Sequence, residues 1–295
     1  MLRLIVTLIY GITAAGPLFL IASGLTLIYG VMRVLNFAHA ALFMLGAYVS
    51  VQLSGGPTVS LGRFVLAAAG AGLAVGLVGL VVERLVFRPL YSRNPEATLL
   101  ASFGLSLLIA GAVERFWGTE PLTQPLPSAL SSSVSISTAS ISVYALVELG
   151  VAVVVAAALM YMLRRTRFGA NAVAVAEDRE MAAVMGIRAR RVGAIVFVLG
   201  SALAGLAGAI VAPTVSVDTG LAPSTLIPVF AVVVMGGLGT VGGAALASLA
   251  IALVQGITTN YLPAISPYAF ILLLALFLIV RPQGLLGRLQ LSREA

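Results

Sequence analysis

Apolar stretches alternate with short polar segments along the whole 295-residue chain. A helix needs about 20 apolar residues to cross a bilayer core about 30 Å thick. The pattern therefore predicts an all-α polytopic membrane protein with about eight to nine transmembrane or broken helices, in one domain over residues 1–295. The nine predicted spans are residues 4–29, 37–53, 61–83, 97–116, 143–163, 191–213, 222–239, 241–258 and 265–281.

Some of these stretches depart from simple full-length spans. Stretch 37–53 is short, and stretch 222–239 nearly touches 241–258, so these helices are candidates for broken or re-entrant structure. The first stretch follows Arg3 and continues apolar to Tyr29. That is longer than the apolar core of about 7–15 residues in a signal peptide, so we expect a retained membrane helix.

Arginines concentrate in alternate polar segments. Fourteen of the 17 basic residues fall in segments 30–36, 84–96 and 164–191 and in the tail after residue 280. Basic residues accumulate on the cytoplasmic side of membrane proteins. This distribution predicts an N-terminus outside and a C-terminus in the cytoplasm, which agrees with an odd number of spans.

The composition excludes an ordinary soluble protein. Hydrophobic residues make up 60% of the chain and charged residues 9%, whereas a soluble domain carries about 25% charged residues. The net charge of +7 would suggest nucleic-acid binding in a soluble protein. Here the basic residues lie between apolar runs, so we expect membrane lipid and no nucleic acid as a partner. The chain has no Cys, which excludes disulfides and thiolate metal sites.

Two polar segments have distinct characters. Residues 117–142 contain Pro and Ser but no basic residue, and they predict an extracytoplasmic loop with a short hairpin at the membrane surface. Residues 164–190 form the long polar segment on the inner side. From Ala170 to Gly186, Ala and Glu favour a helix that Gly186 would end.

The inner segment 164–190 has two interpretations: a docking helix for a cytoplasmic partner, or a solvated connection between spans. Connections in compact domains usually have about 4–6 residues, so the length favours docking. The helix would carry an acidic cluster and a small apolar face, formed by Glu177, Asp178 and Glu180 and by Met181, Val184 and Met185.

Polar residues also interrupt the apolar pattern at residues 29–50. A polar group at membrane depth needs a partner or a water-filled cavity. One interpretation is a helix break that lines a translocation route, with Asn36, Phe37 and His39 as the candidates. The other is a turn in which Asn36 caps the next helix and His39 bonds locally, and for Asn36 we favour capping.

No constellation of catalytic or metal-binding residues emerges. His39 is the only histidine, and a metal site needs several ligands in reach. The acids Glu83, Glu114 and Glu148 lie on three different predicted helices, close to their ends, and the first two directly precede arginines. We therefore expect an interfacial position for these acids, and no enzyme activity, cofactor or metal.

The stretch "MGGLGTVGG" at residues 235–243 contains the G-x-G-x-x-G spacing of a dinucleotide site. Such a site needs a preceding strand and an acid about 20 residues later, and both are missing. We instead predict a tight helix reversal and close helix packing. The residues concerned are Gly236, Gly237, Gly239, Gly242 and Gly243. Small residues four apart at Gly200, Ala204 and Gly208 predict close packing as well.

Three stretches together resemble the permease subunits of branched-chain amino acid ABC importers, the Liv-type family. They are "GLTLIYGVMRVLNFAHAALFMLGAYV", "AVAEDREMAAVMGIRARRVGAIVFVLGSALAGLAGAI" and "FAVVVMGGLGTVGGAALAS". The resemblance covers residues from about Leu20 to Leu285. The family also includes urea and short-amide permeases and is distantly similar to sugar permeases.

The resemblance implies a multi-pass protein of the bacterial-type inner membrane that translocates branched-chain or related amino acids by alternating access. It implies four partners: a homologous second permease, two cytoplasmic ATP-binding subunits that hydrolyse ATP, and an extracytoplasmic solute-binding protein. Segment 164–190 then corresponds to the coupling segment, similar to the "EAA…G" signature of ABC importers. Its candidate residues are Glu177, Asp178, Glu180, Ala182, Ala183, Met185 and Gly186.

Two alternatives stay open. The same machinery could import urea, a short amide or a sugar. In a different class, the chain could be a secondary transporter or channel that works without ATPases. Secondary carriers often place ionisable residues at mid-membrane, and the spans here contain almost none, which favours the ABC importer.

Overall fold

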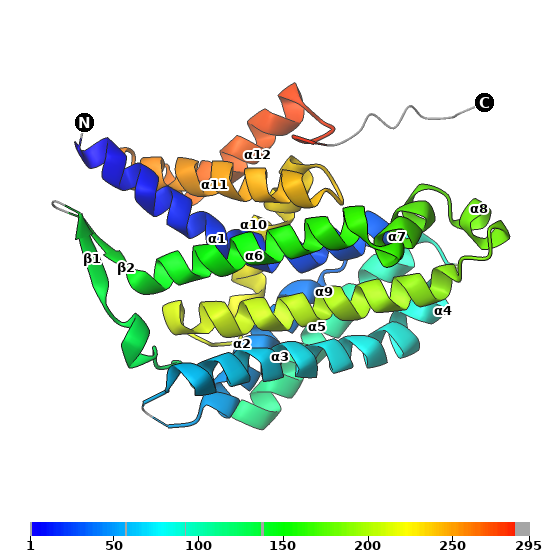
Figure 1. Ribbon diagram of the computed structural model, residues 1–295, viewed down its shortest axis with the longest axis horizontal. Coiled ribbons are helices and arrows are strands. Elements are labelled where there is room, and N and C mark those ends of the chain that lie inside the picture. Colours follow the sequence, from blue (N-terminus) through cyan, green and yellow to red (C-terminus); the bar gives the residue numbers. More distant parts are fainter. Residues whose placement is uncertain (1, 57, 92, 137–138, 287–295) are drawn as a thin grey trace.

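A computed structural model describes residues 2–56, 58–91, 93–136 and 139–286 of the protein (Figure 1). Helices account for nearly all of its regular structure. Two short strands, β1 (Ser133–Ile136) and β2 (Ala139–Ser142), pair antiparallel with Ser133 opposite Ser142. The hairpin predicted within segment 117–142 is therefore present.

The helices follow the apolar stretches of the sequence closely. The α-helices are α1 (Leu2–Met32), α2 (Ala38–Ser54), α3 (Leu61–Val82), α4 (Arg88–Leu90), α5 (Pro95–Trp117), α6 (Val143–Arg165), α7 (Arg167–Glu177), α8 (Arg179–Val184), α9 (Ala189–Val211), α10 (Leu221–Gly236), α11 (Val241–Tyr261) and α12 (Ala269–Val280). A π-helical turn over Glu83–Phe87 joins α3 to α4, and 3₁₀ turns cover Ser128–Leu130, Ala212–Thr214 and Ser266–Tyr268.

Each of the nine predicted spans contains a helix, so the prediction of an all-α polytopic membrane protein is confirmed. Within the described residues, six helical segments are long and apolar enough to cross a bilayer: Val6–Met32, Leu61–Leu90, Glu96–Trp117, Val143–Arg165, Ala189–Thr214 and Val241–Tyr261. Three apolar helices are shorter: Ala38–Ser54, Leu221–Gly236 and Ser266–Val280. The short second span and the seventh span thus form short helices, whereas the eighth span is of full length.

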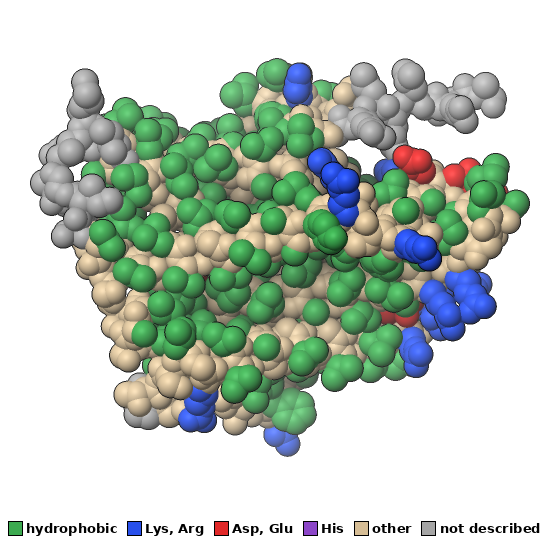
Figure 2. Space-filling model, viewed as in Figure 1, with side chains coloured by type: hydrophobic (Ala, Val, Ile, Leu, Met, Phe, Trp, Pro, Cys, Tyr) green, Lys and Arg blue, Asp and Glu red, His purple; other side chains and the backbone are tan. Residues whose placement is uncertain are grey.

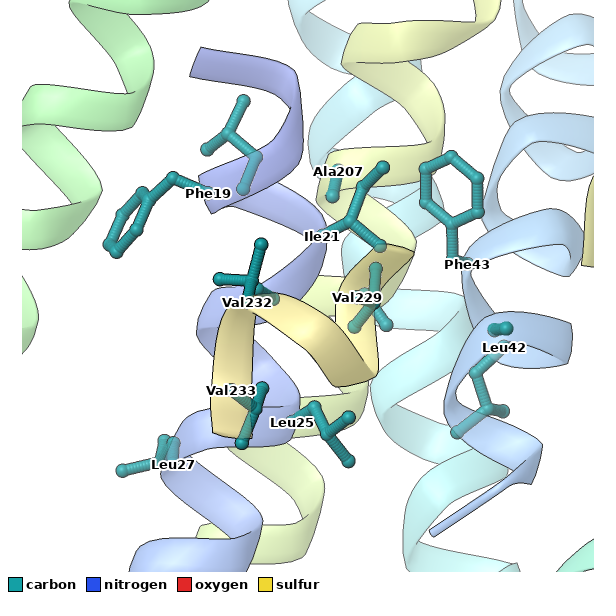
Figure 3. Packing of buried hydrophobic residues seen from close by; sticks show 14 of the residues in the cluster. Phe19, Ile21, Leu25, Leu27, Leu42, Phe43, Ala207, Val229, Val232 and Val233 are labelled. Carbon is teal, nitrogen blue, oxygen red and sulfur yellow. The ribbon is translucent and has the colours of Figure 1, made fainter. Parts of the chain in front are cut away.

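Helices α1 and α9 lie at the centre of the bundle. Helix α9 packs against α1, α2 and α3, and α1 also packs against α6 and α11. The short helix α2 packs against α9, α3 and α5, and the short helix α10 packs against α11, α2 and α1. Figure 3 shows Ile21 of α1, Phe43 of α2, Ala207 of α9 and Val229 of α10 in one apolar cluster.

Small residues on α9 let three neighbouring helices approach it closely. A Cβ atom added to Gly200 would lie 2.8 Å from the Gly24 carbonyl oxygen of α1, and one added to Gly205 would lie 2.7 Å from the Ala71 carbonyl oxygen of α3. A Cβ atom on Gly208 would meet the backbone of α2 at Phe43. The predicted close packing of this glycine-rich helix is therefore confirmed.

The arginine-rich segments of the sequence come together at one end of the bundle, called here the arginine-rich end. Arg33, Arg93 and Arg179, from three of these segments, line one pocket. Leu286 of the tail lines a second pocket together with Arg33 and Glu177. Figure 2 shows basic side chains gathered at this end, near α7 and α8. The four segments predicted to share one side of the membrane thus lie at the same end.

The β-hairpin lies at the opposite end, called here the hairpin end, beside the start of α1 (Figure 1). The Tyr10 hydroxyl donates a hydrogen bond of 2.7 Å to the Ser140 carbonyl oxygen. An isolated antiparallel β-bridge also connects segment 117–142 to the bundle. It pairs Leu122 with Val217, which lies in the connection that follows α9. The N-terminal helix therefore begins on the side of the protein that carries the long polar loop.

The glycine-rich stretch forms the reversal between α10 and α11, at the arginine-rich end. Gly237 ends α10 with φ of 92°, and Gly239 has φ of 87°. Gly236 and Gly243 face each other across the reversal, since a Cβ on Gly236 would lie 2.6 Å from the Gly243 carbonyl carbon. A helix and not a strand precedes these glycines, so their spacing does not build a dinucleotide site.

Gly239 also contacts another helix, whereas Gly242 has more room. A Cβ atom on Gly30 of α1 would lie 2.8 Å from the Gly239 carbonyl oxygen, so these two backbones touch. A Cβ atom on Gly242 meets only the end of the Leu286 side chain, at 3.3 Å. The reversal therefore depends on glycine at Gly239 both for its backbone conformation and for its contact with α1.

We predict that Gly239→Leu destabilises the protein by about 1–3 kcal/mol. The position has a positive φ, which is unfavourable for leucine, and the new side chain would collide with α1. The melting temperature in detergent and the amount of folded chain in membranes measure this. The matched control is Gly242→Leu, which displaces only a flexible side-chain end. Equal melting temperatures for the two variants would contradict the prediction.

Candidate coupling segment and translocation groove

The long polar segment 164–190 forms two helices and not the single helix predicted over Ala170–Gly186. Helix α7 ends at Glu177 and α8 begins at Arg179. Asp178 lies between them in an extended conformation, and its Oδ1 accepts hydrogen bonds of 2.9 Å from the backbone N–H groups of Glu180 and Met181. An aspartate competes for backbone donors and favours N-cap positions, and this ends the first helix and starts the second.

The end of α8 is fixed by Gly186, as the sequence predicts. Gly186 has φ of 81°, and its N–H donates to the Ala183 carbonyl oxygen at 3.0 Å. The N–H of Ile187 donates to the Ala182 carbonyl oxygen at 2.9 Å. This pair of hydrogen bonds is a Schellman motif, in which glycine takes the left-handed conformation without steric cost. Helix α8 is therefore a short unit with defined ends.

Helix α8 lies at the far tip of the arginine-rich end (Figure 1), and apolar side chains on it and directly after it are exposed. Met181 is 59% exposed, Val184 81% and Met185 75%. Ala182 is buried and anchors the helix, while Ala183 and Glu180 are exposed. An exposed apolar cluster rimmed by polar residues is typical of a protein-binding surface. We call Met181, Val184 and Met185 the apolar tip.

The acidic cluster predicted in this segment divides between the two helices. Glu177 lines a pocket of about 460 Å³ with Arg33, Arg164 and Gly239, so it lies against α1 and the glycine reversal. The Arg33 side chain donates to the Ala176 carbonyl oxygen at 3.5 Å. Asp178 is used as a cap and Glu180 lies on α8. Segment 164–190 therefore touches the end of α1 through α7.

A polar cluster around one buried carboxylate joins α8 to the end of α3. The Glu83 carboxylate is fully buried at the π-helical turn. It accepts a hydrogen bond of 3.0 Å from the Tyr91 hydroxyl and pairs with Arg88 at 3.6 Å. The Arg179 guanidinium, at the start of α8, lies 4.9 Å from the centre of the Tyr91 ring. We call Glu83, Arg88, Tyr91 and Arg179 the Tyr91 cluster.

The geometry of this cluster differs from the interfacial pairing expected for Glu83. Its ion-pair partner is Arg88, one π-helical turn later, and not the adjacent Arg84, because neighbouring side chains on a helix point in different directions. Burial, and then the nearby Glu83 carboxylate, raise the pKa of the Tyr91 hydroxyl. The hydroxyl therefore stays protonated and able to donate. π-Helical turns occur frequently at functional sites.

Two polar residues of the motif at 29–50, Asn36 and His39, are buried and hydrogen-bonded near the start of α2. Asn36 Oδ1 accepts a hydrogen bond of 3.1 Å from the N–H of Ala38, the first residue of α2, although the N-cap residue of this helix is Phe37 and not Asn36. His39 Nε2 lies 3.0 Å from the Ile21 carbonyl oxygen of α1. The His39 ring also lies where Gly24 and Gly200 bring α1 and α9 together. Both polar side chains thus support the junction of α2 with the central helices.

Phe37 lies differently, on a groove between α2, α5 and α10. Its ring centre is 5.2 Å from that of Phe230 on α10, and its N–H donates to Ser102 Oγ of α5 at 3.1 Å. The groove has a volume of about 260 Å³. It is lined by Phe37, Ala40 and Ala41 of α2, by Phe103, Ser106, Leu107, Ala110 and Glu114 of α5, and by Thr219, Ala222, Pro223 and Leu226 at the start of α10. Of the three residues predicted for a translocation route, only Phe37 lines it.

The remaining predicted site residues have structural surroundings. Glu148 is buried and receives a weak hydrogen bond of 3.5 Å from the Thr214 hydroxyl, so it is not the interfacial acid expected from the sequence. Among the described residues, no group of three or more acidic or histidine side chains is placed to hold a metal ion. The five glycines of the reversal lie between α10 and α11, as described above.

Sequence reasoning missed the Tyr91 cluster and the groove. The position of Glu83 at the end of an apolar span was a signal that this acid is unusual. Its pairing with Arg88 and its hydrogen bond from Tyr91 depend on the π-helical turn, which the sequence pattern did not indicate. The groove is formed by three helices that are distant in sequence, so no local pattern indicated it.

Comparisons with known proteins place the chain in a family. The family described as "Branched-chain amino acid transport system / permease component" matches residues 7–281. The chain is 29% identical to the high-affinity branched-chain amino acid transport system permease protein LivH of Escherichia coli, over 96% of this chain and 95% of the relative. It is 28% identical to the corresponding protein BraD of Pseudomonas aeruginosa, over 97% and 96%.

A probable permease of the same name, LivH from Methanocaldococcus jannaschii, is 27% identical over 92% of this chain and 88% of the relative. No solved structure matches the chain. The match to the family covers nearly all of the helical bundle, and the six long apolar helices of the described residues are those of a multi-pass membrane protein. The chain belongs to the family of permease components of the branched-chain amino acid transport system.

Proposed function

We propose that this chain is one membrane-spanning subunit of an ATP-driven importer, and that it translocates branched-chain or related amino acids by alternating access. The full chain forms a single permease domain. The relatives are named as permeases of branched-chain amino acid transport systems, which supports the cargo class. The chain itself performs no catalysis in this proposal, and ATP is hydrolysed by partner subunits.

The exposed apolar tip is the main observation that supports docking of an ATPase subunit on this chain. Three large apolar side chains are exposed on α8 and at the residue that follows it, and α8 lies at the arginine-rich end beyond the long helices (Figure 1). A cytoplasmic partner would bury them. The surrounding candidate contacts are Glu180, Ala183 and Gly186, which lie on or beside the same short helix.

The orientation follows from the arginines. The arginine-rich end would face the cytoplasm, because basic loops remain on that side of the membrane. The C-terminus would then be cytoplasmic, and the N-terminus and segment 117–142 would be outside. In this orientation the hairpin end would receive the extracytoplasmic solute-binding protein. A homologous second permease would pack against the lipid-exposed helices, and two ATPase subunits would dock at the arginine-rich end.

Alternating access requires that docking at α8 moves the membrane helices. Two contacts support such a path. Helix α7 touches α1 through Arg33 and Ala176, and α8 touches the end of α3 through the Tyr91 cluster. Closure of the ATPase dimer would move α8, and the buried Glu83 carboxylate would transmit this movement to α3. A change of state of this kind needs a differential interaction with the two conformations, which ATP binding by the partners supplies.

Two alternatives make different predictions. An importer of urea, short amides or a sugar would use the same machinery, and competition of radiolabelled leucine uptake by urea and ribose separates these cargoes. A secondary transporter or channel would work without ATPases. Uptake by this chain alone in vesicles, without ATP or partner subunits, would overturn the proposed function.

We predict that the triple variant Met181→Ser, Val184→Ser, Met185→Ser no longer co-purifies with the ATPase subunits. Burying a large apolar side chain contributes about 1.5–3 kcal/mol, so the loss of three weakens docking by more than about a hundredfold. The control is Val173→Ser, an exposed apolar residue on α7 of the same segment. Unchanged co-purification of the triple variant would argue against docking through α8.

We predict that Tyr91→Phe lowers cargo uptake per ATP hydrolysed several-fold, because a hydrogen bond to a charged group contributes about 1.5–3 kcal/mol. Tyr91→Leu also removes the aromatic ring that contacts Arg179, so it lowers the uptake per ATP hydrolysed further. The measurement is the ratio of uptake to ATP hydrolysis in vesicles that contain the full complex. Tyr161→Phe on α6, where the side chain is 66% exposed, is the control. A normal ratio in both Tyr91 variants would exclude the Tyr91 cluster from coupling.

A further inference from the structure

We infer that the groove between α2, α5 and α10 is this chain's cargo-binding surface, and that Glu114 binds the ammonium group of the amino acid at its outer mouth. The inference rests on the proposed function and names a site within it. The cargo class is a zwitterion with a small aliphatic side chain. Its ammonium group would meet the carboxylate and its side chain would lie along the apolar wall.

The groove lies where the bundle is built from short helices. Helices α2 and α10 have 17 and 16 residues, and α10 contains Pro228. Neither has the length of about 20 residues that a full crossing needs. Short or interrupted membrane helices mark substrate sites in transporters, because their ends place irregular backbone and polar groups at membrane depth. Phe37 and Phe230, one from each short helix, meet beside the groove.

The wall of the groove suits an aliphatic side chain. Small residues, Ala40, Ala41, Ala110 and Ala222, leave room along its length, and larger apolar side chains close its sides. The volume of about 260 Å³ is sufficient for a ligand the size of a single amino acid and small for a drug-sized molecule. Apolar contact with such a wall stabilises a branched aliphatic group by removing it from water.

Glu114 gives the groove its charge. It is the only charged residue among those that line the groove, in a chain with a net charge of +7. It makes no ion pair with any described residue, although Arg115 follows it in sequence. A carboxylate one helical turn inside the end of a membrane helix is costly unless it faces water or a cationic partner. Glu114 is exposed, so its carboxylate is accessible to an ammonium group that enters the groove.

The surroundings of Glu114 strengthen the negative character of the mouth. Asp218, a second acid, directly precedes Thr219, which lines the groove. Asp218 accepts a hydrogen bond of 2.8 Å from the Gly220 N–H and is held at the start of α10. A cationic group arriving at the hairpin end would therefore be drawn to this mouth.

The first experiment compares Glu114→Gln with Glu120→Gln in the complete complex reconstituted in vesicles. Glu120 is an exposed acid in the loop just after α5 and does not line the groove. Loss of a charge-assisted hydrogen bond predicts an initial rate of leucine uptake about tenfold lower or more for Glu114→Gln. Uptake by Glu120→Gln stays at the wild-type rate. The ATPase subunits co-purify with both variants, which separates a cargo effect from failed assembly.

A second experiment tests the position of the groove without relying on the acid. Because the chain contains no Cys, Ala110→Cys introduces a single reactive thiol one turn from Glu114. We expect a membrane-impermeant maleimide to modify it, and turnover with leucine-loaded binding protein to slow this modification at least threefold. Leu108→Cys is the matched control, because Leu108 is 69% exposed on the same helix but does not line the groove. Its modification should not respond to leucine.

The outcomes distinguish the inference from the proposed function. If the wild-type complex takes up leucine but Glu114→Gln and Glu120→Gln transport equally well, the role of Glu114 is overturned and the importer stands. If Ala110→Cys is unreactive or unaffected by leucine, the groove is not the cargo surface. If the wild-type complex takes up no amino acid with a branched side chain, the proposed function itself fails.

Discussion

Close backbone contact between α9 and its neighbours is the constraint on which the rest of the bundle depends. Lipid tails are as apolar as leucine, so membrane helices gain little from the hydrophobic effect and associate through packing. Gly200 and Gly205 let α1 and α3 approach within van der Waals contact of α9, and Gly208 does the same for α2. With α1, α2 and α3 fixed around α9, the positions of α5, α6, α10 and α11 follow from their contacts with this centre.

The polar groups inside the bundle are arranged around that packing. Asn36 bonds the first residue of α2 within the protein interior, and His39 bonds the backbone of α1. Water is scarce at this depth, so polar groups favour protein partners. Oxygen Oε1 of the buried Glu83 carboxylate has two such partners, Arg88 and Tyr91, at the end of α3. Hydrogen bonds of polar residues therefore fix the axial positions of neighbouring helices, which apolar packing alone would determine less strictly.

These two features give the proposed transport cycle a physical basis. The groove opens between α2, α5 and α10, whereas the coupling segment lies at the arginine-rich end beside α1 and α3. Helix α2 is packed on α9 and α3, so a movement of α3 relative to α9 would change the wall of the groove. Docking and cargo release can thus be connected through tightly packed helices, which transmit displacements because interiors have few voids.

The sequence by itself determined the membrane class, the positions of all nine apolar helices, the gathering of arginines in alternate segments and the helix stop at Gly186, because these depend on local length, periodicity and backbone conformation. It also indicated the glycine reversal between α10 and α11. Only the tertiary structure decided which helices form the groove, that Glu83 pairs with Arg88 and Tyr91, and that Asp178 divides the coupling segment. These features depend on contacts between distant segments, or on competition between local capping and helix continuation, and hydrophobic periodicity contains neither.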